Sequence, residues 1–191
     1  MARGTGWRVS PRMLLAGAAT LLYPLIVYAG LRHASPRVMA FALVGVALMR
    51  AGTLRGKPAW IAMVAAALLL AVAVFLSGET LPLKLYPALV NGVMLAVFGW
   101  SLLHPPTVVE RIARLREPDL PPSGVAYTRR VTIAWCLFFV FNGVLALATA
   151  WWASDAVWAL YNGGIAYLLI GLMFAGEWLL RRRVLARKHD D

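Results

Sequence analysis

Long apolar stretches alternate with short polar connections along most of the chain. Windows without charge, or with charge only at their edges, lie at residues 13–31, 36–50, 58–78, 85–103, 131–154 and 156–176. A helix of about 20 apolar residues crosses the hydrocarbon core of a bilayer, which is about 30 Å thick. The pattern therefore predicts an all-α, polytopic membrane helix bundle with six transmembrane helices.

The second window is the shortest of the six. Its uncharged part, residues 38–49, reaches across a bilayer only if Arg37 and Arg50 extend their side chains toward the headgroups. The alternative is a re-entrant segment, which leaves five spans. Residues 13–31 follow a basic leader, as in a signal peptide, but we interpret them as a first span because further apolar windows follow directly.

The basic residues are sorted by this arrangement. The chain has 19 lysines and arginines against 8 acidic residues, and with six spans only Arg32, Arg37 and Lys84 fall on the side opposite to all the others. Basic connections favour the cytoplasmic side of a membrane. The sequence therefore predicts that both termini are cytoplasmic, whereas an odd number of spans would place the two basic termini on opposite sides.

Composition excludes several classes of protein. The chain is 61% hydrophobic and 14% charged, with a mean hydropathy of +0.72, whereas soluble domains are about half apolar and a quarter charged. The net charge of +11 does not indicate nucleic-acid binding, because the basic residues flank apolar windows. They are expected to contact anionic lipids of the bilayer. The single cysteine, Cys136, excludes an intramolecular disulfide.

The longest polar connection, residues 104–130, contains a predicted short amphipathic helix at about 107–116. Thr107 and Glu110 have the spacing of a capping box, which satisfies backbone donors at a helix start. Apolar residues then recur on one predicted face, with arginines beside it. We expect the helix either to lie against lipid and the bundle or to bind a partner protein. The apolar positions are Val108, Val109, Ile112 and Leu115, and the expected lipid or partner contacts are Arg111, Arg114, Arg116, Arg181, Arg182 and Arg183.

Three asparagines, Asn91, Asn142 and Asn162, lie inside predicted spans, and each precedes a glycine. A polar group in hydrocarbon requires a partner. By depth, the three side chains fit one polar cluster in the outer half of the bilayer. The cluster is interpreted as structural hydrogen bonding between helices, with a ligand or ion pathway as the alternative.

Small residues predict sites of close helix packing. Gly164, Gly171 and Ala175 share one face of the last span, and their neighbour is either another span or a second protomer. The glycines that follow the asparagines, Gly92, Gly143 and Gly163, have the same expected role.

No catalytic or metal-ligating pattern is present in the sequence. The histidines lie at span edges or in the tail, and no pair of them has the helical spacing of metal ligands. Among them, His104 is the best candidate for a membrane transferase, yet we expect no carboxylate to orient the ring, and prolines follow it. We therefore expect a protein that is not an enzyme and that has no cofactor or metal.

One local pattern carries a family resemblance. Pro106-x-Val108 leads into Arg111-Ile112, Leu120-Pro121 follows, and a basic residue precedes Ala134-Trp135 and Phe138-Phe139. In this pattern and in hydrophobic layout, residues 85–182 resemble the intracellular septation protein A family of small bacterial inner-membrane proteins. The chain resembles more closely a group of predicted bacterial membrane proteins that are sometimes encoded among genes for aryl-polyene or xanthomonadin-type pigments.

The two resemblances imply different roles. The septation family implies an inner-membrane scaffold that acts in envelope biogenesis or division through contacts with envelope or division proteins. The pigment-associated group implies an accessory or carrier protein for a lipid or polyene precursor. We expect the scaffold, with the carrier as the alternative and a membrane-bound transferase as the third hypothesis.

Overall fold

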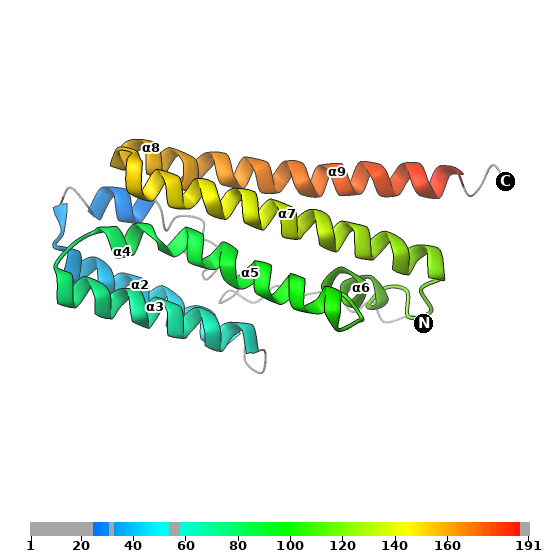
Figure 1. Ribbon diagram of the computed structural model, residues 1–191, viewed down its shortest axis with the longest axis horizontal. Helices are drawn as coiled ribbons and strands as arrows, with labels where there is room; N and C mark the ends of the chain where they lie inside the picture. The colour runs from blue at the N-terminus through cyan, green and yellow to red at the C-terminus, as the bar shows by residue number, and fades with distance from the viewer. Residues whose placement is uncertain (1–24, 31–32, 54–57, 188–191) are drawn as a thin grey trace, which may run out of the picture. The chain divides into compact units, whose positions relative to one another are not determined.

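The computed structural model describes residues 25–30, 33–53 and 58–187, and within these ranges every regular element is a helix (Figure 1). The all-α prediction is confirmed for this part of the chain. The chain divides into two compact units, Met1–Tyr86 and Pro87–Asp191, and each is described separately below. Of the first predicted span, residues 25–30 are helical, and residues 13–24 and 31 lie outside the described residues.

In the first unit, helices α2 (Pro36–Thr53) and α3 (Pro58–Ser77) pack against each other. The contact is made largely by small and branched apolar side chains, and Leu43 of α2 and Val74 of α3 are fully buried. Helix α3 ends at Gly78, whose φ of +71° is one that L side chains rarely adopt. A short helix, α4 (Leu81–Lys84), follows and buries Leu83.

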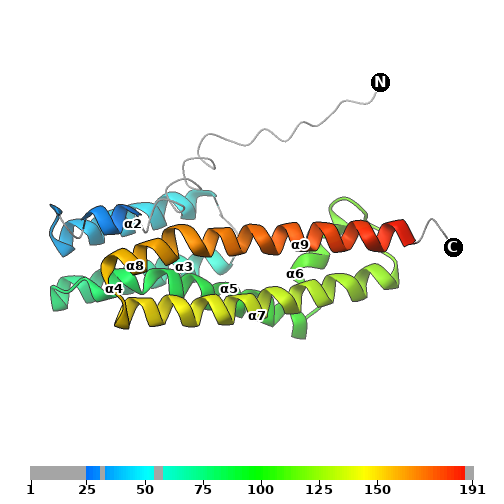
Figure 2. The same ribbon diagram turned by 90° about the horizontal axis from the view of Figure 1, so that it is seen from above.

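The second unit contains the remaining helices. Helix α7 lies beside the last helix along its length in both views (Figures 1 and 2). The last helix is continuous, although one turn within it, η1, is a π-helix. Ser154 begins it by accepting a hydrogen bond from the backbone of Val157. The elements are α5 (Tyr86–Leu103), α6 (Val108–Arg114), α7 (Pro122–Trp152), α8 (Asp155–Leu160), η1 (Tyr161–Ile165) and α9 (Ala166–Arg187).

An aromatic core joins the helices of this unit. Trp135, Phe138 and Phe139 of α7 form a buried cluster, and apolar side chains from α5, α6 and α9 pack against it. Phe98 of α5 meets Phe139 edge to face, with ring centroids 5.2 Å apart. Such aromatic pairs add about 0.5–1.5 kcal/mol beyond the burial of area. The core thus fixes α5, α6 and α9 against α7.

Helix α7 begins nine residues before the span predicted at 131–154. It starts at Pro122, inside the polar connection predicted at residues 104–130. Proline fits the first turn of a helix, where no backbone donor is needed. Gly124 lies within that turn, and a Cβ added there would come 2.9 Å from the Leu120 side chain. The last part of the polar connection predicted at residues 104–130 is therefore the start of a helix.

Three helical segments are long and apolar enough to cross a membrane: Tyr86–Leu103, Pro122–Trp152 and Asp155–Leu179. In the first unit, the apolar helical stretches among the described residues, Pro36–Gly45 and Val64–Ser77, are shorter. The chain thus has the helices of a membrane protein. The number of six spans stays a prediction.

Candidate functional site

A chain of hydrogen bonds between polar side chains links three elements of the second unit. Asn142 of α7 donates from Nδ2 to Oδ1 of Asn91 on α5 at 3.1 Å. The hydroxyl of Tyr161, in η1, donates to Oδ1 of Asn142 at 2.8 Å. Asn91 in turn donates to the backbone carbonyl of Pro87 at 2.9 Å. We call Asn91, Asn142 and Tyr161 the polar chain.

Asn162 makes a second link between the last helix and α7. Its Nδ2 donates to the Thr149 hydroxyl at 3.2 Å and to the carbonyl of Trp158 at 2.9 Å. Asn91 and Asn142 thus contact each other directly, whereas Asn162 binds a different partner. Neither Tyr161 nor Thr149 was among the polar residues predicted from the sequence. The available signal was that a tyrosine within an apolar span requires a partner for its hydroxyl.

The polar chain is uncharged, and each of its side-chain nitrogen and oxygen atoms has a hydrogen-bond partner. Asn91, Asn142 and Tyr161 are all buried, and among the described residues no buried side-chain nitrogen or oxygen lacks a hydrogen-bond partner. A polar group without a partner would be costly in this environment. The arrangement can therefore hold the helices together through hydrogen bonds between buried side chains.

Gly143 lies where α7 approaches α5 next to the polar chain. A Cβ added to Gly143 would come 3.2 Å from the Cβ of Asn91, which is tighter than ordinary packing. At Gly92 and Gly171 an added Cβ would meet nothing within 4 Å, and at Gly164 only its own helix at 4.0 Å. Within the described residues no neighbouring helix packs closely on these three glycines, and packing of Gly164 and Gly171 against a second protomer stays a prediction.

The face expected to bury Gly164, Gly171 and Ala175 is exposed among the described residues. Gly163 is half-buried within η1. Among these small residues, only Gly143 contacts another helix closely in the described part of the chain. Periodicity along one helix identifies a face of small residues, but it does not identify the neighbour that covers this face.

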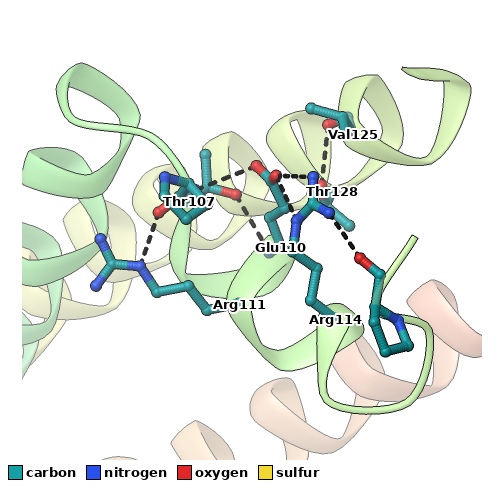
Figure 3. Close-up of polar contacts among 8 residues, drawn as sticks. Thr107, Glu110, Arg111, Arg114, Val125 and Thr128 are labelled. Carbon is teal, nitrogen blue, oxygen red and sulfur yellow. Dashed lines mark hydrogen bonds and ion pairs between the residues drawn. The ribbon is translucent and has the colours of Figure 1, made fainter. Parts of the chain in front are cut away.

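The capping box of α6 is present as predicted. Thr107 accepts a hydrogen bond from the backbone of Glu110 at 3.3 Å, and the Glu110 carboxylate accepts one from the backbone of Thr107 at 3.4 Å (Figure 3). The backbone of Val108 also donates to the hydroxyl of Ser101, on α5, at 3.1 Å. These bonds fix the start of α6 against the end of α5.

An ion pair between two residues of α6 also stabilises this helix. Arg114 donates from Nε and Nη2 to the same oxygen of Glu110, at 3.0 and 2.9 Å, and from Nη1 to the carbonyl of Pro118 at 2.9 Å (Figure 3). Glu110 is buried and Arg114 is partly so. Arg114, predicted as a lipid or partner contact, is therefore engaged within the protein, because the spacing of four residues places it over Glu110.

The apolar stripe predicted on α6 is split between two environments. Val109 packs against the aromatic cluster of α7. Ile112 and Leu115 are 60% and 74% exposed, because the buried side of the helix is taken by Thr107 and Glu110. The predicted apolar positions therefore do not share one environment within the protein, and the contact of α6 with lipid or a partner stays a prediction.

The other arginines expected to contact lipid or a partner have different surroundings. Arg111 is exposed and donates from Nε to the carbonyl of Pro106 at 2.9 Å, and Arg116 is exposed. Arg129 of α7 is also exposed and donates to the carbonyl of Leu102 at 2.9 Å. Arg181, Arg182 and Arg183 lie in α9, and their side chains are outside the described residues.

Two further contacts involve the start of α7 and the end of α5. The hydroxyl of Tyr127 donates to the backbone and the carboxylate of Glu177, at 3.2 and 3.4 Å, which ties α7 to α9. His104 stacks on Trp100, with ring centroids 3.9 Å apart, and its Nδ1 lies 3.2 Å from the carbonyl of Trp100. The ring of His104 is thus held at a helix end, beside an aromatic side chain.

The described part of the chain contains no group of three or more histidine, cysteine, aspartate or glutamate side chains able to hold a metal ion. Comparisons with protein-family models, curated proteins and solved structures found no match. The site is therefore interpreted from its own geometry.

Proposed function

We propose that the chain is a multi-pass bacterial inner-membrane protein with both termini in the cytoplasm. The proposal is supported by three long apolar helices and by basic residues that gather on one side of the predicted spans. In this orientation α6, the start of α7 and the end of α9 lie on the cytoplasmic side.

Helix α7 is too long to lie wholly within the hydrocarbon core of a bilayer. Helix α7 has 31 residues, or about 46 Å at 1.5 Å per residue, against a hydrocarbon core of about 30 Å. Its first residues, 122–130, contain no acidic residue and end in two arginines, so they are placed in the headgroup region and the cytoplasm. The Tyr127–Glu177 bonds hold α9 beside this extension.

The protein acts in this proposal as a scaffold without enzymatic activity. The single observation that supports it best is that the first turns of α7, which extend past the apolar window, are tied to α9 by the bonds from Tyr127 to Glu177. A surface held in this way loses little conformational entropy when it binds a partner. The scaffold presents a cationic cytoplasmic surface to envelope-biogenesis or division proteins, the role that resemblance to the septation family implies.

Charge reversal of one exposed residue on this surface tests the scaffold. Arg130→Glu on α7 should reduce the envelope and division proteins that co-purify with the full chain in mild detergent at least fivefold, because a like charge opposes an acidic partner. Arg37→Glu, an exposed change on the predicted outer side, is the matched control. An equal yield of the same partners from both variants would contradict the scaffold.

A carrier for a lipid or polyene precursor is the second candidate. The π-helical turn Tyr161–Ile165, beside the polar chain, favours it, because π-turns within α-helices occur frequently at functional sites. Asn142→Leu removes two hydrogen bonds between helices, each worth about 0.6 kcal/mol.

Transport and folding of this variant separate the two functions. Loss of transport by reconstituted Asn142→Leu protein that still folds would support the carrier. Loss of folding alone, or a wild-type protein that transports no lipid or polyene precursor, would support the structural role of the polar chain.

A further inference from the structure

Helix α6 presents an apolar surface that the described residues leave open. Ile112 and Leu115 are largely exposed, and Leu103 at the end of α5 is exposed as well. The capping box and the Glu110–Arg114 pair fix the rotation of α6 about its axis, so that these side chains face away from the core. Exposed apolar side chains grouped in this way indicate an interaction surface.

The level of α6 along α7 identifies the surroundings of that surface. Val109 packs against the cluster that contains Trp135. Trp135 lies four residues, or about 6 Å, inside the apolar part of α7 that begins at Val131. In the orientation proposed above, this depth is the boundary between acyl chains and headgroups. The exposed side chains of α6 are therefore at the level of lipid and not in the open cytoplasm.

Positive charge lies beside the apolar side chains. Arg111 and Arg116 are exposed, and Figure 3 shows the two terminal nitrogens of Arg111 pointing away from Thr107 and Glu110. Arg111 is also oriented by the hydrogen bond from its Nε to Pro106. A guanidinium held at the headgroup level forms strong, charge-assisted hydrogen bonds with phosphate.

We propose that α6 binds anionic phospholipid of the cytoplasmic leaflet: Ile112 and Leu115 insert among the acyl chains, and Arg111 and Arg116 bind the headgroup phosphates. This inference rests on the proposed orientation of the protein. It assigns the open side of α6 to lipid, and it leaves the exposed residues of the α7 extension, such as Arg130, to protein partners. Arg114 takes no part, because it is bound to Glu110 and Pro118.

Spin labels in the full chain test the insertion. A nitroxide is placed at Ile112→Cys, Leu115→Cys or Glu117→Cys, on a Cys136→Ala background, and the protein is reconstituted in phosphatidylglycerol nanodiscs. At 112 and 115 the label should collide more with oxygen, which partitions into lipid, than with a water-soluble nickel chelate. At the exposed residue 117 the order should be reversed. Water-exposed labels at all three positions would overturn the proposal.

Lipid selectivity tests the arginines. Native mass spectrometry should show that the wild-type chain retains phosphatidylglycerol in preference to phosphatidylcholine. Replacement of Arg111 and Arg116 by glutamine should reduce this preference about fivefold for each arginine removed. Replacement of the same two arginines by lysine keeps both positive charges and is the control, which should retain the preference. An unchanged preference in the double variant, with normal folding, would overturn the role of the arginines.

Two other results identify different failures. If labels at 112 and 115 are water-exposed alone and become shielded only when a partner protein is added, the surface binds protein and the lipid inference is wrong. If a membrane-impermeant thiol reagent reaches residue 117 from the outer side of the membrane, the orientation itself is wrong. The second result would overturn the proposed function together with this inference.

Discussion

Asn142 has one acceptor oxygen and one donor nitrogen to satisfy inside an apolar span, and it does so with partners on two different helices. The sequence predicted that each buried asparagine requires a partner. It did not predict which one, because the choice depends on how the helices are rotated against each other. Thus Asn91 binds Asn142, whereas Asn162 binds Thr149.

Gly143 and Gly92 provide a matched test at the scale of a residue. Gly143→Ala would place a Cβ 3.2 Å from the Cβ of Asn91, whereas Gly92→Ala places one in open space. We expect the first change to lower the free energy of unfolding by about 1–3 kcal/mol through overpacking. The second should leave it within about 1 kcal/mol of the wild type. Reversible unfolding in detergent micelles measures both, and equal losses would contradict the close approach of α5 and α7.

At the scale of elements, the sequence predicted the helices better than their ends and faces. Charge-free windows detect only the part of a helix that fits hydrocarbon. They therefore missed the first nine residues of α7, which are helical although they end in two arginines. The capping box of α6 was predictable because it is local. The exposure of Ile112 and Leu115 was not, because the Glu110–Arg114 pair occupies the side of α6 toward the bundle.

The ion pair of α6 should control the local stability of that helix. Glu110→Gln keeps the shape of the side chain but removes the charge that Arg114 binds through two nitrogens. Because Arg114 is partly exposed, we expect a loss of about 1–2 kcal/mol.

Hydrogen exchange checks this expectation. In Glu110→Gln, amides of residues 108–114 should exchange about tenfold faster, while the amides of α7 keep their protection. Glu117→Gln, at an exposed position, is the control and should exchange as the wild type does. Unchanged protection of α6 in Glu110→Gln would mean that the capping box and Ser101 suffice to hold it.

At the scale of the whole molecule, composition and periodicity were enough to predict that the regular elements of the described residues are helices and that some of them are long and apolar enough to cross a membrane. In the second unit, the helices contact each other through buried side chains whose partners are identified. Residues 36–50 form a short apolar window in the sequence, and in the structure they lie in the helix Pro36–Thr53, whose apolar stretch is Pro36–Gly45. A membrane crossing by this short stretch depends on the thickness of the surrounding lipid, and neither the sequence periodicity nor the packing within the protein reports that thickness.

The central claim is an even number of crossings with the basic residues in the cytoplasm. Reporter fusions in cells test it directly, with a phosphatase that is active only outside the cytoplasm and a fluorescent protein that folds only within it. Fusions at both termini and after Asp119 should fluoresce without phosphatase activity, and a fusion after Glu79 should show the reverse. Amino- and carboxyl-terminal reporters on opposite sides of the membrane would contradict the account.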